Sequence, residues 1–522
     1  MRTRLGGGAR DVKWAGRARY GDRMSTVQLE SIRHCIGGRQ TSGASTRTAP
    51  VYDPAIGHEQ REVLLAEPED VDAAVQAAKR AFETWRDVSV VRRARIMFAF
   101  RELLNDNLDE LARIISSEHG KTVDDAKGEV IRGMEVVEFA CGIAELLKGE
   151  FSEQVSTDID LHSFRQPLGV CAGITPFNFP IMVPLWMHPM AIATGNAFVL
   201  KPSERDPSVS NRVAELYAEA GLPDGVFNVV HGDKVAVDAI LDHPDIAAVS
   251  FVGSTPIARY VHERATQAGK RVQALGGAKN HAVVLPDADL DFAATQLTAA
   301  GYGSAGQRCM AISVAVAVGD AADDLVERLQ RKAREVKVGP GLDPESEMGP
   351  VVTAQARDRI VGYIEQTQAD VVVDGRELER DGDGFWVGPT LLDNVTTDMD
   401  VYRDEVFGPV LSVVRAESLD EAIELINRNS YANGTAIFTA SGHAARTFQR
   451  AIHVGMVGVN VPIPVPLAFY SFGGWKDSLF GDTHVHGPEG IRFYTRAKVV
   501  TTRWPEQDAG LLKGHLHFPT AH

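Results

Sequence analysis

The chain has 522 residues, a formal net charge of −16 at pH 7, and ordinary hydrophobic and charged fractions of 44% and 24%. At roughly 150 residues per domain, this length predicts about three domains or lobes. The acidic balance argues against a nucleic-acid-binding protein, which usually presents a clustered basic surface. It leaves room for a small anionic substrate, because one or two nearby arginines outweigh a distant acidic surface.

Cysteine usage and the apolar pattern exclude two further classes. The 4 cysteines lie far apart and form no CxxC pair. We therefore expect no metal site and no disulfide framework, and a cysteine with a function should be a lone nucleophile. The longest apolar region, 179–200, is interrupted by prolines, a histidine and a glycine, so no membrane span is expected.

The two ends of the chain differ from the rest. Residues 1–23 carry seven arginines or lysines, only two aspartates, and no apolar periodicity. This composition predicts a disordered tail, with an organelle transit peptide as the alternative. Residues 505–522 are polar and are predicted to form a peripheral tail. The expected location is the cytoplasm of a bacterial-type cell; the mitochondrial matrix applies only if 1–23 are a transit peptide.

Between these ends, the chain alternates helices and strands. Helical periodicity predicts helices at 71–85, 93–117, 125–147, 208–220, 234–241 and 256–265. Short apolar runs predict strands at 168–174, 197–200, 226–230 and 247–252. Strands about 25 residues apart, with helices between them, predict right-handed crossovers and a parallel sheet. The predicted fold class is therefore α/β, with a nucleotide-binding domain of the Rossmann-like kind.

A second α/β series begins near Gly276. Its predicted strands lie at 282–285 and 312–318, and its predicted helices at 323–336 and 419–428. No internal repeat is visible.

Cys309 is the first candidate for chemistry. It follows the small residues GSAG (303–306) and stands directly after Arg308. Small residues permit a ligand to approach closely, and an adjacent cation favours the thiolate over the thiol. The alternative is a buried structural cysteine, the commoner fate of a free cysteine. This segment alone does not decide between the two.

Polar residues also follow three of the predicted parallel strands, where ligands collect in such sheets. Asn178, in TPFNFP after the first strand, could donate to a developing oxyanion, or it could simply be a turn residue. KPSE (201–204) follows the second strand. GST (253–255) opens a helix, whose free N–H groups suit a pyrophosphate. The GxGxxG fingerprint of dinucleotide binding is absent.

Taken together, these segments are informative. TPFNFP, VLKPSE, SFVGST, LGGAKN, GQRC and EVFGPV occur in this order and resemble the aldehyde dehydrogenase superfamily over 36–504. Within it, the chain is most similar to the CoA-acylating branch, the methylmalonate-semialdehyde dehydrogenases. The segments that point there are ITPFNFPIMVPLWMHPMAIATGN, ALGGAKNH, GQRCMAIS, NVPIPVPLAFYSFGGWKDSLFGD and GIRFYTR.

The resemblance implies a role for each candidate residue. Cys309 would be the nucleophile that adds to the aldehyde, and Asn178 with the Cys309 backbone N–H would form the oxyanion hole. NAD would be the cofactor. Glu204, accepting from a free ribose hydroxyl, would disfavour NADP by charge repulsion. The implied cofactor-binding residues are Thr175, Phe177, Lys201, Glu204, Arg205, Gly253, Ser254, Gly276 and Glu405.

One position departs from the hydrolytic members of the family. At residues 274–277 this chain reads A-L-G-G, whereas the hydrolytic members that it resembles read E-L-G-G. Their Glu activates the water that releases a free acid. A methyl group cannot act as a base, so we expect the thioester to wait for coenzyme A as cosubstrate. If Glu405 activates water instead, the enzyme would be hydrolytic. A non-catalytic protein on this fold would be expected to have lost Cys309 or Asn178, and neither is lost.

Two arginines match those that hold the substrate carboxylate in the resembled branch, Arg132 and Arg308. Bidentate pairing suits a short semialdehyde acid. The alternative for Arg132 is a surface pair with Glu129 or Glu135 at helical spacing, and for Arg308 it is thiolate stabilisation. A carboxylate β to the thioester carbonyl leaves easily as CO₂. Methylmalonate semialdehyde would thus give propanoyl-CoA, and malonate semialdehyde acetyl-CoA.

The resemblance also implies three structural parts. An NAD-binding domain would take 24–150 and 168–275, and a catalytic domain 276–471. A small β oligomerisation extension, 151–167 with 490–504, would pair between subunits and build a homotetramer.

Overall fold

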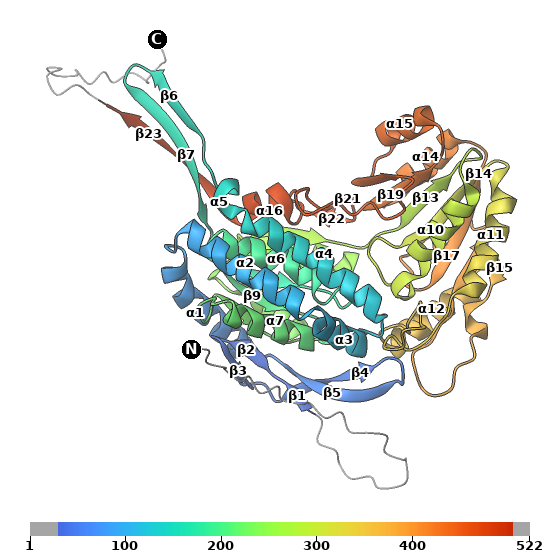
Figure 1. Cartoon of the computed structure of the whole chain (residues 1–522), viewed down its shortest axis with the longest axis horizontal. Helices are drawn as coiled ribbons and strands as arrows, with labels where there is room; N and C mark the ends of the chain where they lie inside the picture. The colour runs from blue at the N-terminus through green and yellow to red at the C-terminus, as the bar shows by residue number, and fades with distance from the viewer. Residues whose placement is uncertain (1–29, 505–522) are drawn as a thin grey trace, which may run out of the picture.

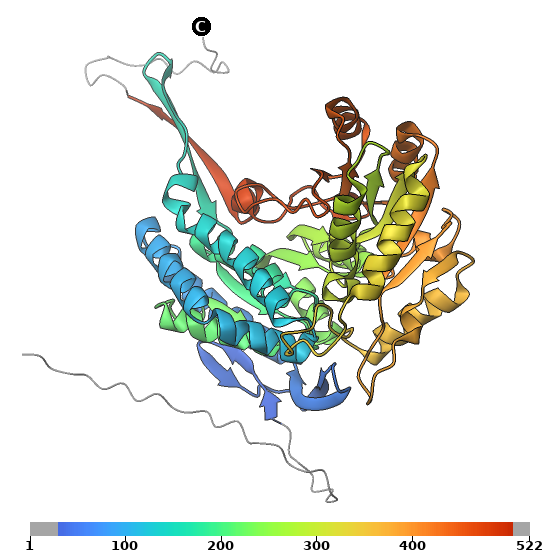
Figure 2. The same cartoon turned by 45° about the vertical axis from the view of Figure 1, so that its right-hand side comes forward.

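The computed structural model describes residues 30–504, so the predicted tails at 1–23 and 505–522 lie outside the described residues. Two large sheets with helices on both faces stand side by side, and a narrow three-stranded sheet projects away from them (Figures 1 and 2). The predicted α/β class is confirmed.

The first large sheet has eight strands in the order β22-β12-β11-β8-β9-β10-β2-β3. Its five central strands are parallel, as predicted, because helices carry the chain back between them. They are β8 (Val170–Ile174), β9 (Ala197–Lys201), β10 (Phe227–Val229), β11 (Ile246–Val252) and β12 (Arg271–Leu275). Antiparallel strands close both edges: β2 (His34–Ile36), β3 (Arg39–Thr41) and β22 (Leu479–Phe480).

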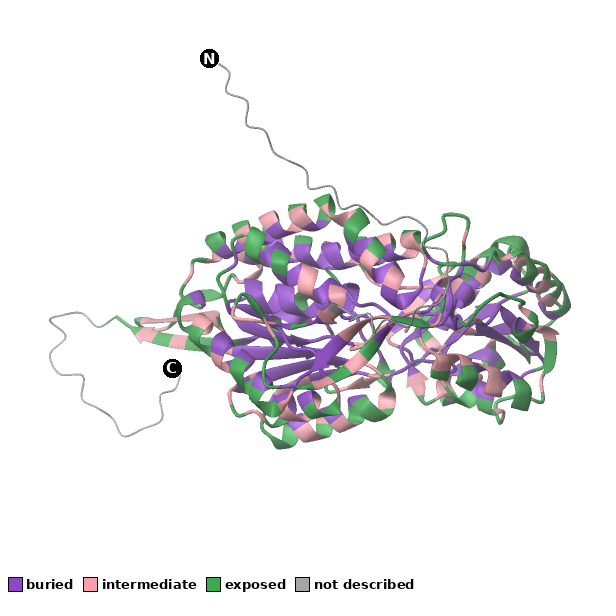
Figure 3. Cartoon of the chain, turned by 90° about the horizontal axis from the view of Figure 1, so that it is seen from below, coloured by how far each residue is buried: buried purple, intermediate pink, exposed green. Residues whose placement is uncertain are grey.

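Helices cover both faces of this sheet, and its central strands β8, β9 and β10 are buried along their whole length (Figure 3). One face packs on α1 (Pro68–Trp85), α8 (Lys234–Asp242) and α9 (Thr255–Gln267). The other packs on α2 (Val90–Asp106), α3 (Leu108–His119), α4 (Val123–Cys141), α5 (Ile143–Leu146), α6 (Met182–Ala193), α7 (Ser208–Glu219) and α16 (Gly487–Phe493).

Three predicted boundaries are wrong. The single helix expected at 93–117 is two helices, because Asn107 leaves the helical conformation and its side-chain amide donates to the Leu103 carbonyl at 2.7 Å. The helix expected at 125–147 is interrupted at Gly142. The expected strand region 490–504 begins as helix α16, and its strand starts only at Thr495.

The second large sheet has seven strands in the order β15-β16-β17-β14-β13-β19-β20, parallel except for the β15–β16 pair. The strands are β13 (Asn280–Val284), β14 (Ile312–Val318), β15 (Asp370–Val373), β16 (Thr390–Asp393), β17 (Val410–Ala416), β19 (Gly434–Phe438) and β20 (Met456–Val459). Its helices are α10 (Leu290–Tyr302), α11 (Ala321–Glu335), α12 (Ala354–Gln366), α13 (Asp400–Arg403), α14 (Leu419–Arg428) and α15 (Gly442–Ala451).

Smaller sheets complete the fold. Strands β1 (Glu30–Ile32), β4 (Arg47–Asp53) and β5 (His58–Leu65) form one, and β18 (Tyr431–Ala432) pairs with β21 (Trp475–Lys476). The projecting sheet is β6 (Phe151–Ser156), β7 (Ile159–Pro167) and β23 (Thr495–Arg503). It exposes apolar side chains such as Phe151 and Val499, each 66% exposed. Pairing of this sheet between subunits stays a prediction.

The packing of α2 on α7 offers a stability test. Phe100 is fully buried, and its ring stacks on Tyr217 with centroids 3.7 Å apart. We expect Phe100→Ala to lower the free energy of unfolding by about 3–5 kcal/mol through lost contacts and a cavity. Phe98, on the same helix but 58% exposed, is the matched control, and Phe98→Ala should change it by less than about 0.5 kcal/mol. Urea unfolding measures both; similar shifts for the two variants would contradict this prediction.

Candidate active site

The carboxyl ends of four adjacent strands meet at one edge of the first sheet. Ile174 of β8 is in register with Lys201 of β9, and Val252 of β11 with Leu275 of β12. Backbone hydrogen bonds extend this register beyond the strands, from Thr175 N to Lys201 O and from Gly253 N to Leu275 O, each 3.1 Å. The turns that follow these strands therefore lie next to one another.

These turns enclose a cavity of about 670 Å³. Two of the nine predicted cofactor residues, Gly276 and Glu405, do not line it. The other seven do: Thr175, Phe177, Lys201, Glu204, Arg205, Gly253 and Ser254. The Arg205 guanidinium lies over the Phe177 ring, 5.1 Å from its centroid. The structure thus brings together predicted residues that are up to about 80 positions apart in the sequence, because parallel strands end at the same edge of the sheet.

The cavity has the features that a dinucleotide requires. The Thr175 hydroxyl is buried and has no hydrogen-bond partner within 30–504, so it is available to a ligand. Ser254 stands at the start of α9, where N–H groups of the first turn lack intrahelical partners. A Cβ at Gly253 would lie 2.5 Å from the Phe251 ring, so glycine is the residue that fits here without moving this ring. These residues fit NAD.

Charge in the cavity is fixed by an ion pair. The Lys201 ammonium lies 3.1 Å from a Glu204 carboxylate oxygen. Burial opposes ionisation of Glu204, but Lys201, a backbone hydrogen bond and Arg205 together outweigh it and lower the pKa of this carboxyl. Glu204 is therefore ionised, and its carboxylate can accept a hydrogen bond from a hydroxyl group of a ligand.

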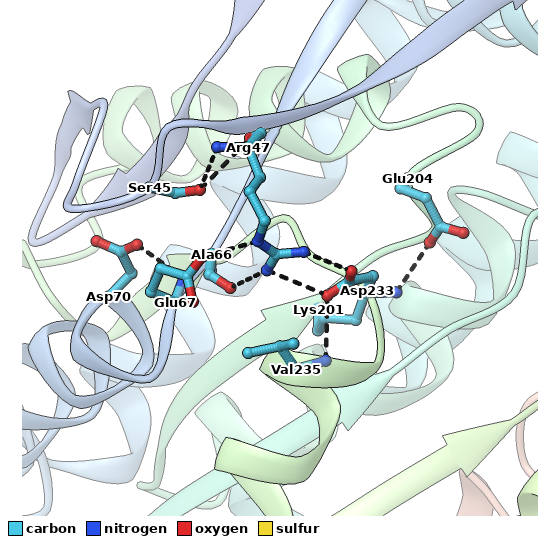
Figure 4. A network of polar contacts seen from close by, with 9 residues as sticks. All are labelled: Ser45, Arg47, Ala66, Glu67, Asp70, Lys201, Glu204, Asp233 and Val235. Carbon is cyan, nitrogen blue, oxygen red and sulfur yellow. Dashed lines mark hydrogen bonds and ion pairs between the residues drawn. The ribbon is translucent and has the colours of Figure 1, made fainter.

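Sequence analysis missed a polar network behind this cavity (Figure 4). Arg47 donates to Glu67 and to Asp233, both at 2.7 Å, and Asp233 lines the cavity. Asp233 also accepts from Val235 N at the start of α8. The network joins β4, α1 and the β10–α8 turn, which are far apart in sequence, so no local pattern could have indicated it.

Cys309 lies in the turn between α10 and β14. Its carbonyl accepts from Asn280 Nδ2 at 2.9 Å, which fixes the backbone at the thiol. The preceding Ser304 and Ala305 are buried with φ of 53° and 51°, a left-handed conformation that costs side-chain-bearing residues energy. Gly306, with φ 67°, has no such strain, but a Cβ there would lie 2.0 Å from the Gly408 carbonyl. The small residues before Cys309 are thus needed for this tight turn.

Arg308 favours the Cys309 thiolate, as its adjacency predicted, but burial has a larger and opposite effect. Burial raises the pKa of the Cys309 thiol to about 12, Glu405 adds to the rise, and the opposing effect of Arg308 is smaller. A base must therefore remove the proton when the thiol reacts.

Glu405 lies in the same small cavity as Cys309. One of its carboxylate oxygens accepts from Ala278 N at 3.0 Å, and burial raises its pKa to about 7. Gly277 is required beside it, since a Cβ there would lie 2.3 Å from the other oxygen. Gly276 donates its N–H to the Ser478 carbonyl at 3.0 Å. A carboxyl with this pKa can exchange protons near neutral pH.

Two aromatic rings connect the cofactor cavity with the cavity of the thiol. Phe177 lines the former and Phe407 the latter, and their ring centroids are 5.9 Å apart in an edge-to-face contact. The two cavities are thus adjacent, since a ring that lines one is in contact with a ring that lines the other.

Asn178 follows β8 and is buried. Its backbone carbonyl accepts from the Lys121 ammonium at 2.7 Å, while its side-chain amide has no hydrogen-bond partner in the described part of the chain. The amide is therefore available as a donor to a substrate oxygen.

The two arginines occupy different surroundings. Arg308 lines the Cys309 cavity and pairs with Asp125. Arg132 does not line it; its guanidinium pairs with Glu135 at 2.6 Å and donates to the Pro466 carbonyl at 2.9 Å. The structure thus contains the helical ion pair that was the alternative for Arg132, although with Glu135 and not Glu129.

Ala274 contributes to the hydrophobic core between β12 and its helices and is fully buried. It lies opposite Phe480 of β22 and lines neither of the two cavities described above. Within residues 30–504, no group of three or more His, Cys, Asp or Glu side chains could hold a metal ion.

Comparison with known proteins gives this geometry a family. The model of the aldehyde dehydrogenase family matches residues 41–500. A malonate-semialdehyde dehydrogenase of Pseudomonas aeruginosa is 54% identical over 485 residues, 92% of this chain and 97% of the relative. One of Halalkalibacterium halodurans is 50% identical over 91% of this chain and 99% of the relative.

Solved structures agree. A Sinorhizobium meliloti protein assigned as a methylmalonate-semialdehyde dehydrogenase, complexed with NAD, superposes with a TM-score of 0.91 at 55% identity. A methylmalonate-semialdehyde dehydrogenase of Oceanimonas doudoroffii gives 0.90, also at 55% identity. Each match covers 92% of this chain and 99% of the other. The family model covers most of the chain and these relatives are at least 50% identical to it, so the chain belongs to the aldehyde dehydrogenase family.

Proposed function

We propose that this chain is an NAD-dependent, CoA-acylating dehydrogenase of malonate and methylmalonate semialdehydes. The observation that carries the proposal is the cavity shared by Cys309, Arg308 and Glu405, in contact through aromatic rings with a cavity that fits NAD. Identities of 50–54% to malonate-semialdehyde dehydrogenases, over nearly their whole length, support the substrate class.

The first half of the reaction forms a thioester on Cys309. The thiol gives its proton to Glu405, and the sulfur bonds to the aldehyde carbon, so that the carbonyl oxygen becomes an oxyanion. The Asn178 amide and the Cys309 N–H donate to this oxyanion. NAD, when bound, supplies the acceptor for the hydride that leaves the same carbon. Phe177, Lys201, Glu204 and Ser254 hold that cofactor.

The second half transfers the acyl group. Loss of CO₂ from the β-carboxylate leaves an enolate, which takes up a proton to give propanoyl or acetyl on Cys309. The sulfur of coenzyme A then bonds to the acyl carbon, the bond from this carbon to the Cys309 sulfur breaks, and the proton of the CoA thiol passes to the Cys309 sulfur. Ala274 offers no carboxylate to activate water, which favours CoA as the acceptor. A hydrolytic aldehyde dehydrogenase is the second candidate, because Glu405, with its pKa of about 7, could activate water beside Cys309.

The assembly and location belong to the same proposal. A homotetramer built through β6, β7 and β23 would cover the apolar side chains that this sheet exposes. The division into an NAD-binding domain, a catalytic domain and an oligomerisation extension rests on the family resemblance, as does the cytoplasmic location. Within the described residues, no helix combines the length and the apolar character needed to cross a membrane.

A single-turnover assay with and without CoA tests the reaction. With saturating NAD and malonate semialdehyde, the wild type should give a burst of NADH and then turn over only with CoA, yielding acetyl-CoA by mass. Cys309→Ala should bind NAD but give no burst, because the nucleophile is missing. Free acid released without CoA as fast as acetyl-CoA forms with it would establish the hydrolytic candidate instead.

The pKa of Glu405 predicts a pH dependence. Below its raised pKa of about 7 the carboxyl is protonated and cannot accept the thiol proton; above it, the carboxylate can. The rate of the NADH burst should therefore rise with pH around that value, well below the pKa of the thiol itself. Glu405→Gln should flatten this rise. Retention of the same midpoint in Glu405→Gln would assign the ionisation to another group.

Substrate choice tests the arginines. Arg132→Ala should lower kcat/KM for malonate semialdehyde by about tenfold more than for propanal, since only the former has a carboxylate to pair. Glu135→Gln, which frees the Arg132 guanidinium without removing it, is the control and should retain the preference. Equal losses on both substrates in Arg132→Ala would mean that Arg132 acts through folding alone.

A further inference from the structure

Lys121 is a buried cation that the reaction described above does not use. It is 1% exposed and lies between α3 and α4. Its ammonium donates to Glu129 and to the Asn178 carbonyl, both at 2.7 Å, and lies 4.5 Å from the centroid of the Phe179 ring. The Lys121 ammonium thus contacts its counter-ion Glu129 and the turn that contains Asn178 and Phe179.

Glu129 holds the other end of the same turn. It is 2% exposed, and the carboxylate oxygen that does not face Lys121 accepts from Ile181 N at 2.9 Å and from Met182 N at 3.2 Å. These N–H groups begin α6, where a negative charge is favourable. One buried ion pair therefore holds the chain on both sides of Phe179, at Asn178 before it and at Ile181 and Met182 after it.

The chain around Lys121 is itself anchored, both to helix α3 and to the part of the chain that builds the second large sheet. The Ser116 hydroxyl donates to the Lys121 carbonyl at 2.6 Å, and Val123 N donates to the Gly341 carbonyl at 3.0 Å. A Cβ at Gly341 would lie 2.1 Å from that Lys121 carbonyl, so the two segments are in close contact. The ion pair thus links Asn178 to the lobe that carries Cys309.

We propose that the buried Lys121–Glu129 pair is a positioning device that sets the Asn178 amide toward the oxyanion formed at Cys309. An oxyanion donor is effective only if its direction is fixed before the charge develops. The Asn178 side chain has no partner of its own in the described part of the chain, so its direction is set by its backbone. The inference rests on the proposed function of Asn178.

A double-mutant cycle tests it. Replacing Lys121 alone would leave Glu129 as an uncompensated buried charge, so Lys121→Met and Glu129→Gln are introduced together. This neutral pair is made in the wild-type chain and in Asn178→Ala, and the NADH burst rate is measured with malonate semialdehyde. We expect the neutral pair to slow the burst about tenfold or more in the wild-type background but less than about threefold in Asn178→Ala, because the two act as one unit.

A surface pair on the same helices provides the matched control. Lys127 of α4 pairs with Asp109 of α3 at 2.6 Å in an exposed position. Lys127→Met with Asp109→Asn should leave the burst unchanged in both backgrounds. NAD affinity and the thermal unfolding midpoint of each variant, measured alongside, show whether it is folded.

Each outcome has a distinct meaning. Equal slowing by the neutral pair in both backgrounds, or no slowing in either, would overturn the positioning role while leaving Asn178 as the donor. A normal burst in Asn178→Ala alone would overturn the proposed oxyanion role itself, and the positioning role with it. Failure of the neutral pair to fold would overturn it as well, by showing that Lys121 and Glu129 serve the fold.

Discussion

Desolvation of Cys309 and Glu405 is the constraint on which the rest of the site depends. Burial raises the pKa of the thiol to about 12 and that of Glu405 to about 7, so the two groups differ in the direction that keeps the thiol protonated. A thiolate is therefore made only together with the new bond to the substrate. The same low polarity strengthens each hydrogen bond that is donated to the oxyanion in the proposed reaction.

Two ion pairs, one fully buried and one partly buried, connect helix α4 and the turn before it with the segments that carry Asn178 and Cys309. Lys121 with Glu129 and Arg308 with Asp125 both join α4 or its preceding turn to a catalytic segment. Helix α4 thus supplies Glu129 as the counter-ion of Lys121 beside Asn178, and Asp125 as the counter-ion of Arg308 beside Cys309. This arrangement explains why a helix remote from the strand ends contributes to the site.

Periodicity in the sequence was sufficient for the elements and for the edge at which ligands bind. Strands β8 to β11 and helix α14 lie where apolar runs predicted them, since burial on both faces leaves a clear signal. The break at Asn107 was missed because a side-chain hydrogen bond, not a proline or glycine, makes it. The pairs of Arg47, Arg308 and Lys121 depend on tertiary contacts across up to about 190 residues, for which one sequence carries no signal. The adjacent Arg308 correctly indicated an effect that favours the thiolate, but the larger effect of burial on the thiol's pKa could not be predicted from adjacency in sequence.

The choice between CoA and water depends on where carboxylates can stand. A side chain at 274 faces the hydrophobic core, so this position contributes volume and no charge. Glu405 is then the carboxylate near Cys309, but it accepts from Ala278 N and also takes up the thiol proton in the proposed reaction. A group that has just accepted a proton is a weak base for a water molecule until it loses that proton again. Coenzyme A needs less help, because a thiol is far more readily ionised than water. In the proposed reaction, the surroundings of Cys309 would therefore delay hydrolysis without blocking transfer to a thiol.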